Sequence, residues 1–220
     1  SMGEGGKRDA AISAFNEYLG SQQRDTVDVC MMAICRFATR AQISDKMQPI
    51  AQVLPLSRST YVPSGSTALF DAIAYVVAEI DRGKADDDRV LCVILTDGEE
   101  NASRETTLEQ VKEVIAAKEK TGFWTFVYLS ASPNAFAQGR NLGVSAGNVA
   151  GFSDSAVGTQ NVMRAMSASH HAYRIGNDTY VNDTMAAYQD DLRPQAPATQ
   201  APPAHLPKER PDDMWVPKQR

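Results

Sequence analysis

The sequence predicts an α/β fold in which a mostly parallel central sheet carries helices on both faces. Residues 90–95, VLCVIL, form an unbroken apolar run that is rich in β-branched residues and too short for a typical helix. This pattern is typical of a strand that is buried on both faces in the middle of a parallel sheet. Segments with helical and strand-like patterns alternate along the rest of the chain, as they do in sheets whose parallel strands are joined by helices.

The first half of the chain contains two predicted helices and two predicted strands. Residues 7–19 place apolar side chains at helical spacing, and we expect this helix to end at Gly20. A largely apolar strand is predicted over 27–37, and 41–53 are interpreted as a short edge strand with a turn. A helix is predicted over 68–81, with Ser66 or Thr67 as its N-cap because a hydroxyl oxygen can accept from an amide of the first turn.

In the second half of the chain, predicted strands and helices again alternate. Residues 86–88, three aspartates, form a solvated loop before the strand at 90–95. The elements expected after it are a helix over 107–120 with Leu108, Val111, Val114 and Ile115 facing inward, a buried strand over 123–129, a short helix over 134–142, a short strand over 149–152, and a final helix over 156–173 with Val162 and Met166 inward.

Composition narrows the classes of function. The 220 residues carry a net charge of -5 and a pI of about 5.2, which argues against a nucleic-acid or anionic-membrane partner. The three cysteines lie in apolar runs, and buried reduced thiols there favour a cytoplasmic setting over a disulfide or a zinc site. No run approaches the length of a membrane span.

The character of the sequence changes near its end. We expect one domain over 1–174, an extension over 175–192 and a proline-rich flexible tail over 193–220, since the tail has few apolar residues to bury.

Polar residues follow two predicted turns at one edge of the sheet. Thr96, Asp97 and Gly98 end the strand at 90–95, and Ser64 to Thr67 precede the helix at 68–81. Open α/β sheets bind ligands beyond the carboxyl ends of their strands. Hydroxyl and carboxylate oxygens are hard donors that suit Mg²⁺ or Mn²⁺. Considered alone, Asp97 has an equally good interpretation as a turn or capping residue.

Neighbouring polar residues have simpler interpretations. Glu99 and Glu100 either add negative potential to the site or, as we favour, complement the dipole of the following helix in its first turn. Asn101 and Ser103 are interpreted as turn and capping residues, and Asp71 as either an orienting residue or a cap. His170 and His171 are predicted on the surface of the last helix.

These two turns resemble a known family. Residues 65–73, GSTALFDAI, and residues 90–101, VLCVILTDGEEN, are similar to the second and third loops of the metal-ion-dependent adhesion site of von Willebrand factor A domains. The resemblance covers roughly residues 1–173 and implies a Rossmann-like fold. It also implies that Thr67 and Asp97 hold the metal.

The resemblance is incomplete at the beginning of the chain. The family carries a central first strand and an Asp-x-Ser-x-Ser loop before the helix that here spans 7–19, and this strand is not in the sequence. The opening Ser-Met-Gly fits the end of that motif, which would make Ser1 a third metal ligand, and it fits equally well with an incidental start.

The function implied by the resemblance is cation-dependent protein binding rather than catalysis. Mg²⁺ or Mn²⁺, held by Ser1, Thr67 and Asp97, would engage an Asp or Glu of a partner protein. Two alternatives remain open at this point: a Mg²⁺-dependent phosphotransferase or phosphohydrolase of doubly wound fold, and a metal-free interaction scaffold. The sequence does not indicate the oligomeric state.

Overall fold

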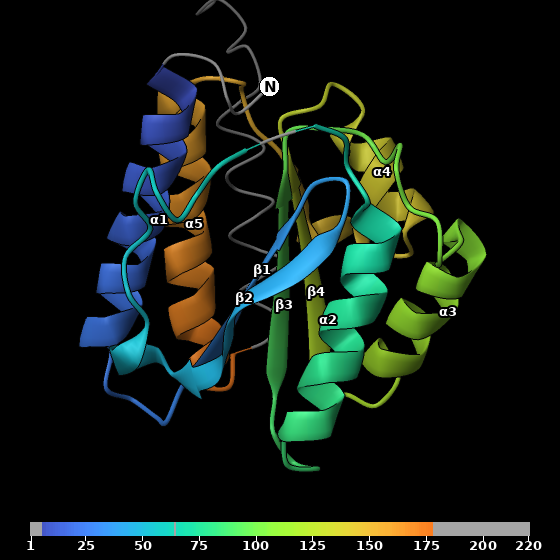
Figure 1. Cartoon of the computed structure of the whole chain (residues 1–220). Coiled ribbons are helices and arrows are strands. Elements are labelled where there is room, and N and C mark those ends of the chain that lie inside the picture. The colour runs from blue at the N-terminus through green and yellow to red at the C-terminus, as the bar shows by residue number, and fades with distance from the viewer. Residues whose placement is uncertain (1–5, 64, 178–220) are drawn as a thin grey trace, which may run out of the picture.

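The computed structural model describes residues 6–63 and 65–177, which form five helices and five strands in that range. Figure 1 shows the elements in chain order. They are α1 (Gly6–Arg24), β1 (Met31–Phe37), β2 (Ala41–Pro49), a 3₁₀ turn (Ile50–Gln52), α2 (Leu69–Gly83), β3 (Val90–Thr96), α3 (Leu108–Glu119), β4 (Trp124–Ser130), α4 (Ala135–Asn141), a second 3₁₀ turn (Ala146–Asn148), β5 (Val149–Gly151) and α5 (Ala156–Arg174).

The strands form two sheets among the described residues. β3, β4 and β5 are parallel neighbours, with Val90 opposite Trp124 and Tyr128 opposite Val149. β1 and β2 form an antiparallel hairpin that pairs with no other described strand. The predicted α/β class and the parallel strands are confirmed, and the short edge strand with a turn predicted over 41–53 corresponds to β2 and the 3₁₀ turn after it.

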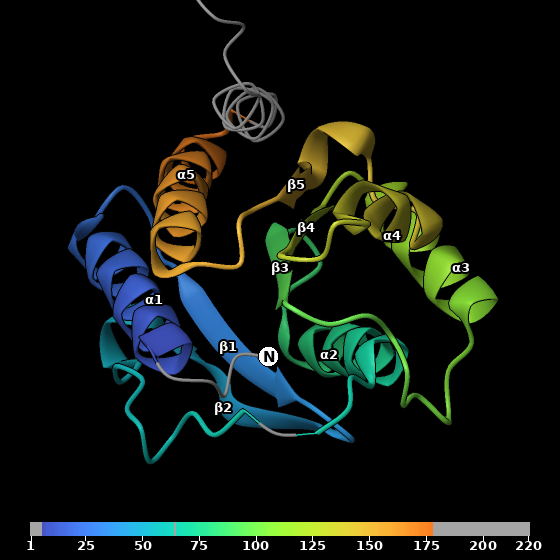
Figure 2. The same cartoon turned by 90° about the horizontal axis from the view of Figure 1, so that it is seen from above.

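Helices cover both faces of this arrangement, as predicted. Figure 2 shows α1 and α5 side by side on one face and α2, α3 and α4 on the other. One core cluster joins α1 and α5 to the side chains of Val127 and Leu129, which point to that face of β4. A second cluster joins α2 and α3 to Phe126 and Tyr128 on the opposite face. β4 is therefore the strand around which the core is built.

The first helix is longer than predicted, because Gly20 lies inside it and α1 continues to Arg24. The prediction that it ends at Gly20 is wrong. Beyond the glycine, the hydroxyl of Ser21 lies 2.5 Å from that of Ser167, and Gln22 Nε2 donates to the Ser167 carbonyl at 3.2 Å. This packing against α5 outweighs the roughly 1 kcal/mol that an interior glycine costs a helix.

The strand predicted from Val27 begins only at Met31. Val27 and Val29 are 50% and 89% exposed, so the segment before β1 does not join the core. Instead, the buried guanidinium of Arg174 holds it, through Asp28 Oδ1 at 2.6 Å and the Asp25 carbonyl at 3.0 Å. Cys30 consequently precedes the strand.

The strand at 90–96 occupies the predicted place but is not buried on both faces. Ile94 and Thr96 are buried, whereas the other five residues of β3 are partly exposed. In β4, by contrast, every residue except Thr125 is buried. The difference arises because β3 is an edge strand of its sheet and its far edge meets no described strand.

The last helix ends at Arg174, close to the predicted position. Residues 178–220, which hold most of the predicted extension and the whole predicted tail, lie outside the described residues. None of the helices within the described ranges is long and apolar enough to cross a membrane.

Candidate functional site

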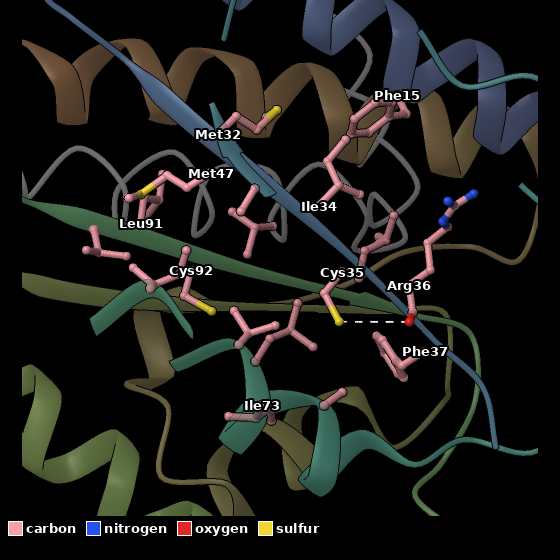
Figure 3. A pocket seen from close by; sticks show the side chains of 18 of the residues that line it. Phe15, Met32, Ile34, Cys35, Arg36, Phe37, Met47, Ile73, Leu91 and Cys92 are labelled. Carbon is pink, nitrogen blue, oxygen red and sulfur yellow. Dashed lines mark hydrogen bonds between the residues drawn. The ribbon is translucent and has the colours of Figure 1, made fainter. Parts of the chain in front are cut away.

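A cavity of about 960 Å³ lies between the β1–β2 hairpin and β3. Figure 3 shows Ile34 and Cys35 of β1 and Leu91 and Cys92 of β3 around this space, with Ile73 of α2 nearby. At the carboxyl end of β3 the lining becomes polar and includes Thr67 and Asp97. The two described residues that were predicted to bind metal therefore border the same cavity, while Ser1 lies outside the described residues.

The turn that carries Asp97 is held by the residue before it. Thr96 is buried, and its Oγ1 accepts a hydrogen bond from Gly98 N at 3.1 Å and donates to Gly98 O at 3.0 Å. Asp97 is thereby fixed at the point where β3 ends, and its side chain is partly exposed. The side chain of Thr96 therefore closes the turn around Asp97.

The loop that carries Thr67 is joined to the loop after Asp97 by main-chain and side-chain hydrogen bonds. Thr67 N donates to Asn101 Oδ1 at 2.8 Å, and Thr67 O accepts from Asn101 N at 3.0 Å and from Ala102 N at 3.2 Å. A Cβ placed on Gly98 would lie only 2.7 Å from Thr67 Oγ1. The Thr67 hydroxyl thus packs against Gly98, immediately next to Asp97 in the chain, and only a glycine permits this approach.

The beginning of α2 is capped from a distance rather than by its own N-cap. The N-cap is Ala68, whose side chain makes no capping bond, so the prediction of Ser66 or Thr67 is wrong. Glu100 Oε2 and Ser103 Oγ both accept from Phe70 N at 3.0 Å, and Ser103 Oγ also lies 3.2 Å from Asp71 N. As a result, the hydroxyl of Thr67 is not used as a cap.

Glu100 is the centre of this capping network. Its Oε1 accepts from Ala102 N and Ser103 N, and its Oε2 accepts from the Ser103 hydroxyl and Phe70 N. Burial raises the pKa of the Glu100 carboxyl, but these hydrogen bonds outweigh that effect and leave the pKa below its usual value. The helix whose amino end it complements is α2, because α3 starts only at Leu108, and the predicted role at the following helix is wrong.

Glu99 points elsewhere. It is exposed, and its Oε1 accepts from Ser132 Oγ at 3.3 Å and from Asn134 Nδ2 at 3.1 Å. Like Glu100, it lies outside the first turn of α3. It therefore connects the loop after β3 to the loop after β4.

Asp71 holds the rest of the loop. Its carboxylate accepts from the backbone amides of Arg104, Glu105 and Thr106 at 2.8–3.1 Å. Partial burial raises its pKa, and the three amide donors lower it further than burial raises it. Of the two interpretations left open, the structure supports the orienting one: Asp71 fixes the loop that connects the site to α3.

The charge of Asp97 acts on Tyr61, a residue that no sequence pattern singles out. Burial raises the pKa of the Tyr61 hydroxyl, and the Asp97 carboxylate raises it further, because a tyrosinate beside a carboxylate is disfavoured. Tyr61 also lines the cavity. The signal that could have identified it is weak, since Tyr61 lies in the proline-containing loop before α2 and has no pattern of its own.

The donor set suits a hard cation that keeps part of its water shell. Thr67 and Asp97 offer a hydroxyl and a carboxylate, whereas Glu100 and Asp71 are turned toward backbone amides. Within residues 6–63 and 65–177 no group of three Asp, Glu, His or Cys side chains could hold a metal ion. Mg²⁺ commonly binds through one or two protein carboxylates and several waters, so the residues present fit it better than they fit zinc.

The two histidines have different environments. His171 is exposed and pairs with Asp25, as expected of a surface residue. His170 is buried, with Tyr18 Oη 2.7 Å from its Nδ1, so the prediction that it lies on the surface is wrong. Burial, and secondarily the charge of Arg174, lowers the pKa of His170 to about 4. Both histidines lie on α5, which packs against α1. His170 lines the same cavity as Thr67 and Asp97, whereas His171 lies outside it.

Comparison with known proteins was made at the level of sequence and of structure. No protein-family model and no curated protein matches the sequence. Among solved structures, the fold is similar to that of "von Willebrand factor type A from Catenulispora acidiphila", with a TM-score of 0.47 and 11% sequence identity. The match covers 74% of this chain and 38% of the other, so this chain corresponds to well under half of that protein's length.

Proposed function

We propose that the chain is a protein-binding module that holds Mg²⁺ or Mn²⁺ at Thr67 and Asp97 and uses it to bind an acidic residue of a partner protein. The observation that carries the proposal is the pairing of one hydroxyl and one carboxylate at the polar end of the cavity. Around them, the network of Glu100, Ser103 and Asp71 fixes both loops.

Each residue of the site has a distinct part in this proposal. Asp97 supplies the negative charge that attracts the cation, and Thr67 supplies a neutral oxygen that does not add to the charge. The bound cation would supply a Lewis-acidic position at which a partner's carboxylate can replace water. Gly98 allows the hydroxyl of Thr67 to approach, because a Cβ at position 98 would lie only 2.7 Å from that oxygen.

Catalysis by a thiol nucleophile is disfavoured, because two of the thiols along the cavity are poor nucleophiles. Burial raises the pKa of Cys35 to about 11 and that of Cys92 to about 12. At neutral pH both thiols stay protonated, and the thiolate is the reactive form. The alternative of a phosphohydrolase is left as an outcome of the experiment.

Calorimetric titration of the full chain with Mg²⁺ and with Mn²⁺ tests the proposal. We expect binding by the wild type, at least about tenfold weaker binding by Thr67→Val, and none by Asp97→Ala. Asp86→Ala, which removes an exposed carboxylate from the loop before β3, is the matched control and should bind as the wild type does. Absence of binding in the wild type, or equal binding by Asp97→Ala, would overturn the proposal.

The partner group is tested by a second measurement on the same proteins. Bound Mn²⁺ enhances the relaxation of water protons, and a peptide Gly-Asp-Gly should reduce this enhancement when its carboxylate replaces water, whereas Gly-Asn-Gly should not. Hydrolysis of p-nitrophenyl phosphate that requires Mg²⁺ and Asp97 would replace the binding proposal with the phosphohydrolase alternative.

A further inference from the structure

The polar end of the cavity carries two arginines that the proposed function does not use. Arg36 is the second-last residue of β1, and Arg40 lies in the turn that joins β1 to β2. Both line the cavity, which they approach from the hairpin, whereas Thr67 and Asp97 approach it from the loops before α2 and after β3. The two arginines are therefore a second group of polar side chains around this space.

The turn of the hairpin packs against the loop that carries Thr67. Ala38 O, directly after β1, accepts from Ala68 N at 2.6 Å. In the same turn, Thr39 Oγ1 would lie 3.1 Å from a Cβ added to Gly65. Gly65 and Ala68 flank Thr67 in the chain, so the hairpin turn and the proposed metal ligands lie at the same end of the cavity.

Neither guanidinium makes a hydrogen bond, an ion pair or a ring contact with another residue of the described ranges. Arg36 is one of three arginines there that are partly buried. The other two have partners: Arg8 Nε donates to a backbone carbonyl at 2.8 Å, and Arg174 Nε donates to Asp28 Oδ1 at 2.6 Å. Removing a charge from water without a partner is unfavourable, so the position of Arg36 points to an anionic ligand.

The charge at this end of the cavity differs in sign from that of the whole chain. Close to the carboxyl ends of β1 and β3, the charged residues that line the cavity are Arg36, Arg40 and Asp97. In the proposed function the carboxylate holds the cation, and a bound Mg²⁺ would make this end more positive still. The 220 residues together carry a net charge of -5. A positive site on an acidic chain attracts an anionic segment of a partner and repels a second copy of the chain.

The type of cation indicates which anion fits. A guanidinium presents a planar fork of N–H donors that matches the two oxygens of a carboxylate, which a lysine ammonium does not. Figure 3 shows Arg36 pointing away from Phe37, its neighbour in β1, which packs on the side of α2. Arg36 is held on a strand, so its direction is fixed, whereas Arg40 is exposed in a turn.

We propose that Arg36 and Arg40 bind a second carboxylate of the partner, so that the module recognises a segment with two acidic residues rather than a single Asp or Glu. One acidic residue binds the cation at Thr67 and Asp97, and the other pairs with Arg36, while Arg40 adds to the attraction. The inference rests on the proposed function, because the same partner segment supplies both carboxylates.

The test uses the full chain loaded with Mn²⁺ and two sets of short peptides. Each peptide of the first set has two aspartates separated by none, one, two or three glycines, and each peptide of the second set has Asn in place of the second Asp. Water-proton relaxation measures the displacement of water from Mn²⁺. We expect at least one doubly acidic peptide to act at a concentration at least about tenfold lower than its Asn counterpart.

Variants assign this advantage to the arginines. Arg36→Met keeps the length of the side chain without its charge, and it should remove the advantage and leave the Asn peptides unaffected. Arg36→Lys keeps the charge without the fork and should retain part of it. Arg140→Met, which removes an exposed guanidinium from α4, is the matched control and should behave as the wild type does. No advantage in the wild type, or an equal advantage in Arg36→Met, would overturn the proposal.

Failure of this inference and failure of the proposed function give different results. If only the arginine site is wrong, all peptides displace water equally well. If the metal function is wrong, none does, and the same peptides labelled with fluorescein are then titrated in EDTA by anisotropy. A preference for two aspartates that is lost in Arg36→Met would support the arginine site by itself, and the absence of that preference would overturn both proposals.

Discussion

Replacing Glu100 by Gln tests whether the two loops of the site are held together by one partly buried carboxylate. Glu100 accepts four hydrogen bonds, from Phe70 N, Ala102 N, Ser103 N and the Ser103 hydroxyl, at 2.7–3.0 Å. Gln has a single acceptor oxygen, and its amide group would face two of the four donors. Hydrogen bonds to charged groups contribute about 1.5–3 kcal/mol each, so we expect Glu100→Gln to lower the free energy of unfolding by about 2–4 kcal/mol.

Urea unfolding followed by the fluorescence of Trp124, which is buried in β4, measures this change. Glu99→Gln is the matched control, because its neighbouring carboxylate is exposed and accepts only from Ser132 and Asn134. Its effect should stay below about 0.5 kcal/mol. Equal stabilities of the two variants would refute the reasoning that Glu100 holds the loops.

Comparing wild type with Glu100→Gln also predicts how the stabilisation by Glu100 depends on pH. The pKa of Glu100 is lower in the folded state than its ordinary value of 4.5. The stabilisation is therefore fully present above pH 4.5 and is lost as the pH falls through the folded pKa. The difference between wild type and Glu100→Gln should be constant from pH 5 to 8 and shrink below pH 4.5. A difference that persists at lower pH would mean that the charge is not its cause.

Two further predictions concern the glycine of the site and the buried histidine. Gly98→Ala should lower the free energy of unfolding by about 1–3 kcal/mol and weaken Mg²⁺ binding in calorimetry, because the new Cβ would meet Thr67 Oγ1 at 2.7 Å. Gly20→Ala, inside α1 and 3.4 Å from the flexible end of Arg24, is its control and should stabilise by about 0.5–1 kcal/mol; destabilisation by both would show that the close approach at Gly98 is not special. His170 has a folded pKa of about 4 against 6.5 in the unfolded chain, so stability should fall by about 3 kcal/mol as the pH drops from 6.5 to 4. In urea titrations across that range His170→Gln should show a smaller fall, and an unchanged fall would assign the effect to other groups.

Local patterns were sufficient to identify the elements because the spacing of apolar residues differs between helices and strands. The apolar run at 90–95 predicted β3, and the spacing of Val111 and Ile115 predicted the inward face of α3. Element ends were predicted less well, since Gly20 as a helix end and Val27 as a strand start were local signals. Contacts with α5, which is distant in the sequence, decided both boundaries.

The candidate site, too, could be predicted only in part from the sequence. A strand that ends in Thr96, Asp97 and Gly98, and a turn that carries Thr67, could be found in the sequence, because ligand sites in such sheets follow strand ends. The roles of the neighbouring residues Glu100 and Thr67 in capping could not be found in the sequence. Glu100 complements α2 rather than α3, and Thr67 is not a cap, because residues about thirty positions apart share hydrogen bonds.

By itself, the sequence determined the α/β class, the order of the elements and the oxygen-rich turns at one sheet edge, because these follow from periodicity and from the residues at strand ends. Only the tertiary structure decided that β3 is half-buried at an edge, with a cavity between it and β1. An apolar run records that a strand is suited to burial on both faces. Which neighbours provide that burial depends on pairing between distant segments, and no local pattern encodes it.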